Sequence, residues 1–169
     1  MAKAVFLDRD ETLNPDPGYI SDPDLFMLYP WVSSELKRLK EAGYLLIVVS
    51  NQSGVGRGLI PAGALSRIHQ KLNHLLFAEA GIGIDHFAIC THRPEDSCEC
   101  RKPKPNLILD SATQFGVDLG ASFMIGDRES DYQAGINAGV RRAFKIEPGD
   151  EASFKLAVKA ILEEATSGI

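Results

Sequence analysis

Short apolar runs alternate with longer amphipathic segments along the whole chain, and this pattern predicts the order of strands and helices. The apolar runs are bounded by Gly, Asp, Asn or Ser, which is typical of β-strands. The first four have the character of strands buried on both faces, as in a parallel sheet. The predicted strands cover residues 4–7, 44–49, 86–90, 122–126 and 140–146.

Helices are predicted between and after these strands, because apolar residues recur there at helical spacing. The first helical face is marked by Val32, Leu36 and Leu39. The segment 129–138 is followed by Gly139, near the position at which a glycine commonly ends a helix. The other predicted helices fall within residues 65–76, 105–115 and 154–165.

This alternation predicts an α/β fold: a Rossmann-like open parallel sheet, joined by right-handed crossovers and covered by helices on both faces. The chain has 169 residues, 44% of them hydrophobic, which is enough for one sizeable core. We therefore expect a single domain over residues 1–169. The intervals after the first and third strands are too short to encode a large cap domain.

The charge of the chain favours small-molecule chemistry. A formal net charge of -5 provides no electrostatic basis for binding nucleic acid or an anionic membrane. No apolar run approaches the roughly 18 residues that cross a bilayer, and the N-terminal stretch is too short for a signal peptide. The three cysteines all lie within residues 90–100, unlike the disulfide framework of a secreted protein. We expect a cytoplasmic monomer.

Polar side chains gather where the predicted strands end. In an open α/β sheet, ligands bind outside the carboxyl ends of the strands. These side chains therefore predict a site at that edge. They are Asp8 and Asp10 after the first strand, Ser50 and Asn51 after the second, Cys90 and His92 at the third, and Asp127 and Asp131 after the fourth.

The pair Asp8 and Asp10 is suited to acid–base and nucleophilic chemistry. Residues two apart on an extended chain point to the same side, so both carboxylates can reach one reacting centre. A hard cation such as Mg²⁺ would neutralise the pair and bind phosphate oxygens, with Asp127 as a third oxygen ligand. The structural alternative is a solvated turn followed by a helix cap. The coincidence of polar residues at several strand ends favours the site.

Four segments resemble the motifs of haloacid-dehalogenase-superfamily phosphatases. The resemblance implies an Mg²⁺-dependent phosphomonoester hydrolase that works through an aspartyl-phosphate on a small phosphorylated metabolite. The segments occur in the family's order and are specific in combination. They are DRDETLN (8–14), VVSNQSG (48–54), CRKPKP (100–105) and IGDRESD (125–131).

The resemblance also implies a role for each residue at a motif position. Asp8 corresponds to the nucleophile, and Asp10 to the acid that protonates the leaving alkoxide and later deprotonates water. Ser50 would donate a hydrogen bond to a phosphoryl oxygen, and Lys102 would balance charge on that group and on Asp8. Asp127 would hold Mg²⁺ with the Asp8 carboxylate and the Asp10 backbone carbonyl.

One position departs from the family pattern. The residue after the second Asp is usually Gly, whereas this chain has Glu11. If the backbone there needs a positive φ, Glu has a steric cost that Gly avoids. The departure also brings a further negative charge near the site, which puts catalytic efficiency in doubt but removes none of the reacting groups.

The cysteine-rich segment 90–100 predicts a structural zinc-binding loop. Cys90, His92, Cys98 and Cys100 form the pattern C-x-H-x5-C-x-C, which supplies four ligands for a closed tetrahedral Zn²⁺ site. The alternative is a set of buried or free thiols beside a surface histidine. A zinc ion here would direct the following Arg101 toward the site, together with Lys102.

The same zinc loop occurs in the subgroup that contains heptose-bisphosphate 7-phosphatases and histidinol-phosphate phosphatases. Two segments, 14–20 and 51–58, resemble loops of the former. Arg101 and Arg128 favour removal of the 7-phosphate from D-glycero-D-manno-heptose 1,7-bisphosphate, because guanidinium groups would bind the second phosphate. Asp16 and Glu11 keep histidinol phosphate open. The expected substrate-binding residues are Asp16, Gly18, Tyr19, Asn51, Gln52, Ser53, Arg101 and Arg128.

Two other classes of protein are considered. A phospho-receiver module also carries an acidic cluster, a Ser/Thr and a Lys, but its phosphorylated Asp follows the third strand rather than the first. A zinc-stabilised nucleic-acid-binding module would need a basic face, which this acidic chain does not indicate. Multiple turnover of a phosphate ester would distinguish the enzyme from both.

Overall fold

The computed structural model describes residues 1–167 and contains a five-stranded sheet whose strands are all parallel. The strand order is β3-β2-β1-β4-β5. The chain adds strands outward from β1 and then returns to its other side with β4, so the topological switch point lies between β1 and β4. The strands are β1 (Lys3–Leu7), β2 (Tyr44–Asn51), β3 (His86–Cys90), β4 (Phe123–Gly126) and β5 (Arg142–Lys145).

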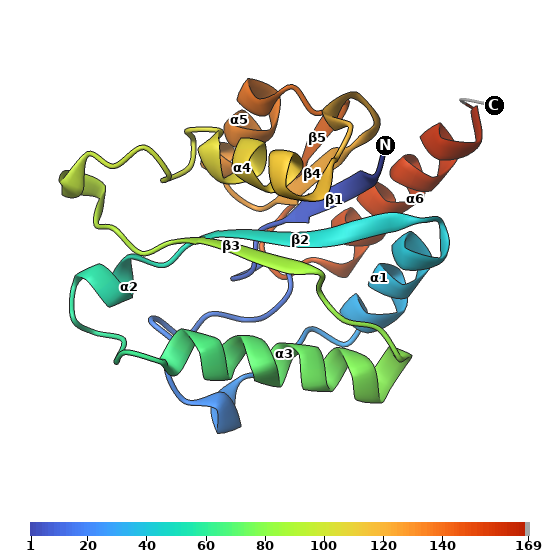
Figure 1. Ribbon diagram of the computed structural model, residues 1–169. Helices are drawn as coiled ribbons and strands as arrows, with labels where there is room; N and C mark the ends of the chain where they lie inside the picture. The colour runs from blue at the N-terminus through green and yellow to red at the C-terminus, as the bar shows by residue number, and fades with distance from the viewer. Residues whose placement is uncertain (168–169) are drawn as a thin grey trace.

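Helices cover both faces of the sheet, which confirms the predicted fold class. Helices α1 (Val32–Glu41), α3 (Ala64–Ala80) and α6 (Glu151–Ser167) lie on one face, and α4 (Asn106–Phe115) and α5 (Glu129–Ala138) lie on the other (Figure 1). All of the predicted strands and helices are present, with ends shifted by a few residues. The glycine-rich stretch after β2 contains an additional short helix, α2 (Ser53–Gly56).

Strand β1 shows why the sheet is buried on both sides. Val5 and Leu7 face the core beneath α1, α3 and α6, whereas Ala4 and Phe6 face the core beneath α4 and α5. All four side chains are fully buried. Successive residues of a strand point to opposite faces, so an uninterrupted apolar run serves two cores at once.

The connections that leave the carboxyl edge of the sheet are loops rather than domains. Residues 8–31 join β1 to α1, and residues 91–105 join β3 to α4; each contains only one short 3-10 helix. Within residues 1–167 there is therefore no separate large cap, as expected. In the same part of the chain, no helix is both long and apolar enough to cross a membrane.

Candidate active site at the carboxyl edge of the sheet

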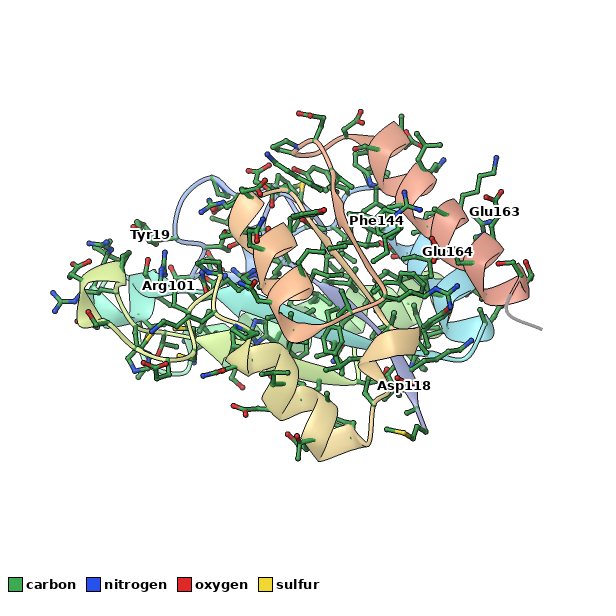
Figure 2. The ribbon with its side chains drawn as sticks, turned by 90° about the horizontal axis from the view of Figure 1, so that it is seen from above. Tyr19, Arg101, Asp118, Phe144, Glu163 and Glu164 are labelled. Atoms are coloured by element: carbon green, nitrogen blue, oxygen red, sulfur yellow. The ribbon has the colours of Figure 1, made fainter. Side chains whose placement is uncertain are left out.

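A cavity of about 340 Å³ opens at the carboxyl ends of the strands. All of the residues predicted to be catalytic or substrate-binding line this cavity. Tyr19 and Arg101 lie near one another at the same end of the molecule, far from Glu163 and Glu164 on α6 (Figure 2). The lining residues are Asp8, Asp10, Asp16, Gly18, Tyr19, Ser50, Asn51, Gln52, Ser53, Arg101, Lys102, Arg128, Ser130 and Asp131.

Lys102 is a buried cation that lines the cavity. Its Nζ donates to Asp8 Oδ1 at 2.8 Å, to Asp131 Oδ1 at 2.5 Å and to the carbonyl oxygen of Val49 at 2.7 Å. An ammonium group has three protons, so each of them has a partner and the position of the group is determined. Burial alone would lower the pKa of Lys102, but the two carboxylates raise it above its ordinary value. The side chain is therefore charged.

Asp8, Asp127 and Asp131 form a buried acidic cluster. One oxygen of each lies within 4.8 Å of the others. Burial raises the pKa of Asp8 to about 6 although Lys102 opposes it, and burial together with the charge of Asp8 raises the pKa of Asp131. Thr12 donates a hydrogen bond to Asp127 Oδ1 at 3.3 Å. The donor set consists of hard oxygens with more negative charge than one lysine balances, which fits a divalent cation such as Mg²⁺.

The sequence predicts Asp131 at the polar edge of the sheet but indicates no role for it there. The structure places it against Lys102 and the other acids, and it also accepts a hydrogen bond from the backbone N–H of Arg128 at 3.0 Å. That bond caps the first turn of α5. Its signal in the sequence is the last position of IGDRESD, four residues after Asp127.

Asp10 is held in a different environment from Asp8. Asn14 and Gln52 donate to its two oxygens at 3.0 and 2.9 Å, and the guanidinium of Arg9 donates to both. Burial alone would raise the pKa of Asp10, but the charge of Arg9 and these hydrogen bonds hold it below its ordinary value. The two carboxylates of the DRD stretch therefore differ in pKa, with that of Asp8 raised and that of Asp10 lowered.

Side chains at the carboxyl end of β2, and Gln52 directly after it, connect the surroundings of Asp8 and Asp10. Gln52 Nε2 donates to Ser50 Oγ at 2.8 Å as well as to Asp10. The amide of Asn51 pairs with the backbone of Lys102 in both directions, at 3.0 and 3.2 Å. Among residues 1–167 nothing accepts the Ser50 proton, so this hydroxyl is free to donate into the cavity.

Glu11 has a positive φ of 65°. This is the backbone conformation in which Glu was expected to have a steric cost that Gly avoids. Its side chain is nevertheless well bonded: Tyr29 Oη donates to Oε2 at 2.9 Å and the backbone N–H of Asp16 donates to Oε1 at 3.0 Å. Glu11 does not line the cavity. Its carboxylate braces the loop that follows β1 instead of entering the pocket.

The loop with Asp16, Gly18 and Tyr19 packs against α2. Gly18 N–H donates to Asp16 Oδ1 at 2.9 Å, which makes a tight turn. Tyr19 reaches α2 at Gly54, where a Cβ atom would lie 2.6 Å from Tyr19 Cδ1. Only glycine allows this close approach, and it brings the ring of Tyr19 to the mouth of the cavity. Arg101 also lines the cavity, and its Nη1 is buried with no hydrogen-bond partner among residues 1–167.

The four predicted zinc ligands converge on one point beside this site. The thiols of Cys90, Cys98 and Cys100 are free, and with His92 Nδ1 they lie 2.9–3.7 Å apart in the contacts that join them. A tetrahedral zinc with Zn–S bonds of about 2.3 Å needs ligand separations of about 3.7 Å. The donor set fits Zn²⁺. The loop is tied to the cavity because Gln52 N–H donates to the Cys90 carbonyl at 2.7 Å.

Comparison with known proteins finds similarity to phosphatases of one family. A HAD-hydrolase-like family model matches residues 99–144. The chain is 45% identical over 139 residues to the D-glycero-beta-D-manno-heptose-1,7-bisphosphate 7-phosphatase of Helicobacter pylori, covering 82% of this chain and 80% of that protein. It is 34% identical over 153 residues to the enzyme of the same name from Escherichia coli K12, covering 86% and 80%.

A solved structure shares both fold and sequence with this chain. It is the D,D-heptose 1,7-bisphosphate phosphatase of B. bronchiseptica, complexed with magnesium and phosphate. The TM-score is 0.85 at 30% identity, covering 96% of this chain and 99% of that one.

Proposed function

The chain belongs to the haloacid-dehalogenase-like phosphatases, and we propose that it removes the 7-phosphate of D-glycero-β-D-manno-heptose 1,7-bisphosphate. One observation carries this proposal: a buried Asp8 paired with Lys102, with Asp10 in a separate environment, lines a cavity that also contains Arg101 and Arg128. Asp8, Lys102 and Asp10 can transfer one phosphate group of the substrate, and the two arginines can bind its second phosphate. The names of the similar enzymes support the sugar and its β-anomer.

In the first chemical step, an Asp8 carboxylate oxygen attacks phosphorus and the bond from phosphorus to the sugar oxygen breaks. Asp10, whose pKa is lowered in the free protein, takes up a proton as the negative charge of the phosphate arrives beside it, and it donates that proton to the departing alkoxide. The charges on the transferring group are balanced by Lys102, and the Ser50 hydroxyl donates to one of its oxygens. The products of this step are the sugar with a free hydroxyl group at position 7 and an aspartyl-phosphate at Asp8.

In the second step, water attacks the phosphorus of the aspartyl-phosphate. Asp10, now ionised, takes a proton from that water, and the bond between Asp8 and phosphorus breaks. Inorganic phosphate leaves and both carboxyls return to their initial states. The hydrogen bonds from Arg9, Asn14 and Gln52 would hold Asp10 in place through both proton transfers.

We also propose that Asp8, Asp127 and the backbone carbonyl of Asp10 hold Mg²⁺. The fit rests on the hard oxygen donors of the acidic cluster and on the excess negative charge there. When bound, Mg²⁺ would neutralise the nucleophile and the phosphate oxygens. A magnesium ion in the similar B. bronchiseptica enzyme supports the assignment.

We propose a second, structural metal: Zn²⁺ held by Cys90, His92, Cys98 and Cys100. Thiolates and imidazole select this softer ion over Mg²⁺. Its role would be to hold the loop that leads into Arg101 and Lys102. Thiolate ligands persist in a reducing compartment, which supports the expected cytoplasmic location. A monomer is proposed because every group of the reaction comes from one chain, and light scattering of the purified protein would test it.

Substrate choice is tested by measuring kcat/KM on one preparation for both anomers of the heptose bisphosphate and for histidinol phosphate. We expect the β-bisphosphate to be preferred, because Arg101 and Arg128 match a second phosphate and would repel the ammonium of histidinol. Arg128→Gln should reduce this preference by raising KM for the bisphosphate. A preference of the wild-type enzyme for histidinol phosphate would overturn the substrate while leaving the phosphatase chemistry intact.

A further inference from the structure

The buried guanidinium of Arg9 lies between Asp10, the proposed acid and base, and His69 on helix α3. Arg9 is fully buried. Its Nε and Nη2 donate to the two oxygens of Asp10 at 2.9 and 3.2 Å, and its Nη1 lies 3.2 Å from Nε2 of His69. His69 lies on α3, and it is not among the site residues predicted from the sequence.

The state of His69 follows from its partners. A guanidinium can only donate, so Nε2 must accept and the proton of the imidazole must lie on Nδ1. Burial, reinforced by the charge of Arg9, lowers the pKa of His69 to about 4, so the ring is neutral at physiological pH. The ring also stacks on Phe87 of β3, with centroids 4.1 Å apart and planes within 11°. The acceptor is therefore fixed both in protonation and in position.

We propose that His69 is a positioning residue for the phosphatase reaction: through Arg9 it holds the Asp10 carboxylate in the orientation that proton transfer requires. The inference rests on the function proposed above, in which Asp10 is the acid and base. Without an acceptor at residue 69, the buried Nη1 of Arg9 has no partner, and the guanidinium must turn to find one. Both oxygens of Asp10 are bonded to that guanidinium and would turn with it.

The expected loss is partial, because Asp10 has other partners. Asn14 and Gln52 still bind one oxygen each. Removal of the His69 acceptor should therefore slow proton transfer rather than abolish it. Proton transfer matters most for a poor leaving group, so the loss should depend on the substrate. A sugar alkoxide needs a proton to leave, whereas p-nitrophenolate leaves without one.

The test compares His69→Asn with His69→Gln. The amide oxygen of Gln can take the place of Nε2, whereas that of Asn corresponds to Nδ1 and cannot reach Arg9. We expect His69→Asn to lower kcat/KM for the heptose bisphosphate about tenfold, the scale of one hydrogen bond to a charged group. For p-nitrophenyl phosphate the loss should stay below about twofold, and His69→Gln should recover most of the activity on both substrates.

His74→Leu is the matched control, because His74 is exposed on the same helix; it should behave like the wild type. An equal loss on both substrates, or no loss in His69→Asn, would overturn the positioning role. If His69→Asn fails to fold, His69→Leu fills the volume without supplying an acceptor and takes its place with the same expected pattern. Two results separate this inference from the proposed function. If Asp10→Asn retains turnover of the bisphosphate, Asp10 is not the acid and base and the positioning role falls with it, whereas wild-type enzyme that does not hydrolyse the bisphosphate would overturn the proposed function.

Discussion

Replacing Asp8 by Asn should abolish turnover and, without added magnesium, should stabilise the fold at neutral pH. Burial raises the pKa of Asp8 from 3.8 to about 6 even with Lys102 beside it. A difference of about 2 units means that an ionised Asp8 costs about 3 kcal/mol in the native state. That cost already includes the opposing attraction of Lys102, so the neutral Asn, whose amide oxygen can still accept from Lys102, should gain up to about 3 kcal/mol.

The gain in stability of Asp8→Asn over the wild type should be larger at high pH than at low pH. Since the folded-state pKa is higher than the unfolded one, the cost of ionised Asp8 is full above pH 6 and disappears as the pH falls toward 3.8. Asp8→Asn should therefore be more stable than the wild type at pH 8, and should lose most of that advantage by about pH 4.5. Urea denaturation of the zinc-loaded proteins at several pH values would measure this.

The control is Asp110→Asn, an exposed acid on α4, which should change stability by less than about 0.5 kcal/mol at each pH. Activity is measured separately with saturating magnesium, where Asp8→Asn should lose at least about a thousandfold in kcat. A variant that is less stable than the wild type at pH 8 by the same amount as at pH 5 would refute the reasoning. It would mean that the pair of Asp8 with Lys102 outweighs the burial of the carboxylate.

Three further predictions concern the loops around the cavity. Glu11→Ala should be less stable than Glu11→Gly by about 1 kcal/mol in urea denaturation, because both lose the side-chain hydrogen bonds but only Ala retains the steric cost of the positive φ; equal stabilities would contradict a strained backbone. Gly54→Ala should raise KM for the bisphosphate several-fold with little change in kcat, because a Cβ would lie 2.6 Å from Tyr19 Cδ1 and 2.7 Å from Ile60 Cδ1 and would push both side chains aside. An unchanged KM would show that the position of the Tyr19 ring does not affect substrate binding. Metal analysis should find one zinc per chain. Cys98→Ser should lose this zinc, unfold at a lower temperature and lose activity that added magnesium does not restore. Full activity without zinc would contradict the structural role.

The strands and the polar edge of the sheet were predictable because their signals are local. A strand buried on both faces must be apolar at consecutive positions, and a ligand site at its end must begin with polar residues. Asp8, Ser50 and Asp127 each follow such a run directly. Parallel strands then bring their carboxyl ends together, so adjacency in space follows from position in the sequence.

The contacts that hold these groups in place were not predictable in the same way. His69 reaches Arg9 only because α3 packs against the sheet beside β3, and no spacing in the sequence relates the two residues. Asp131 depends on the first turn of α5 to face Lys102. Helix α2 is too short for a helical period to be visible. Each of these features requires the tertiary arrangement of elements, not the pattern within one of them.

The most direct test of the proposed mechanism is to trap phosphate on Asp8. Wild-type enzyme would be mixed with excess heptose bisphosphate and magnesium, quenched in acid within the first turnover and treated with borohydride, which reduces an aspartyl-phosphate to homoserine. Mass spectrometry of the N-terminal peptide should find homoserine at position 8, and none in enzyme quenched without substrate. Turnover of the bisphosphate with position 8 recovered only as aspartate, and with inversion of configuration at phosphorus, would contradict covalent catalysis by Asp8.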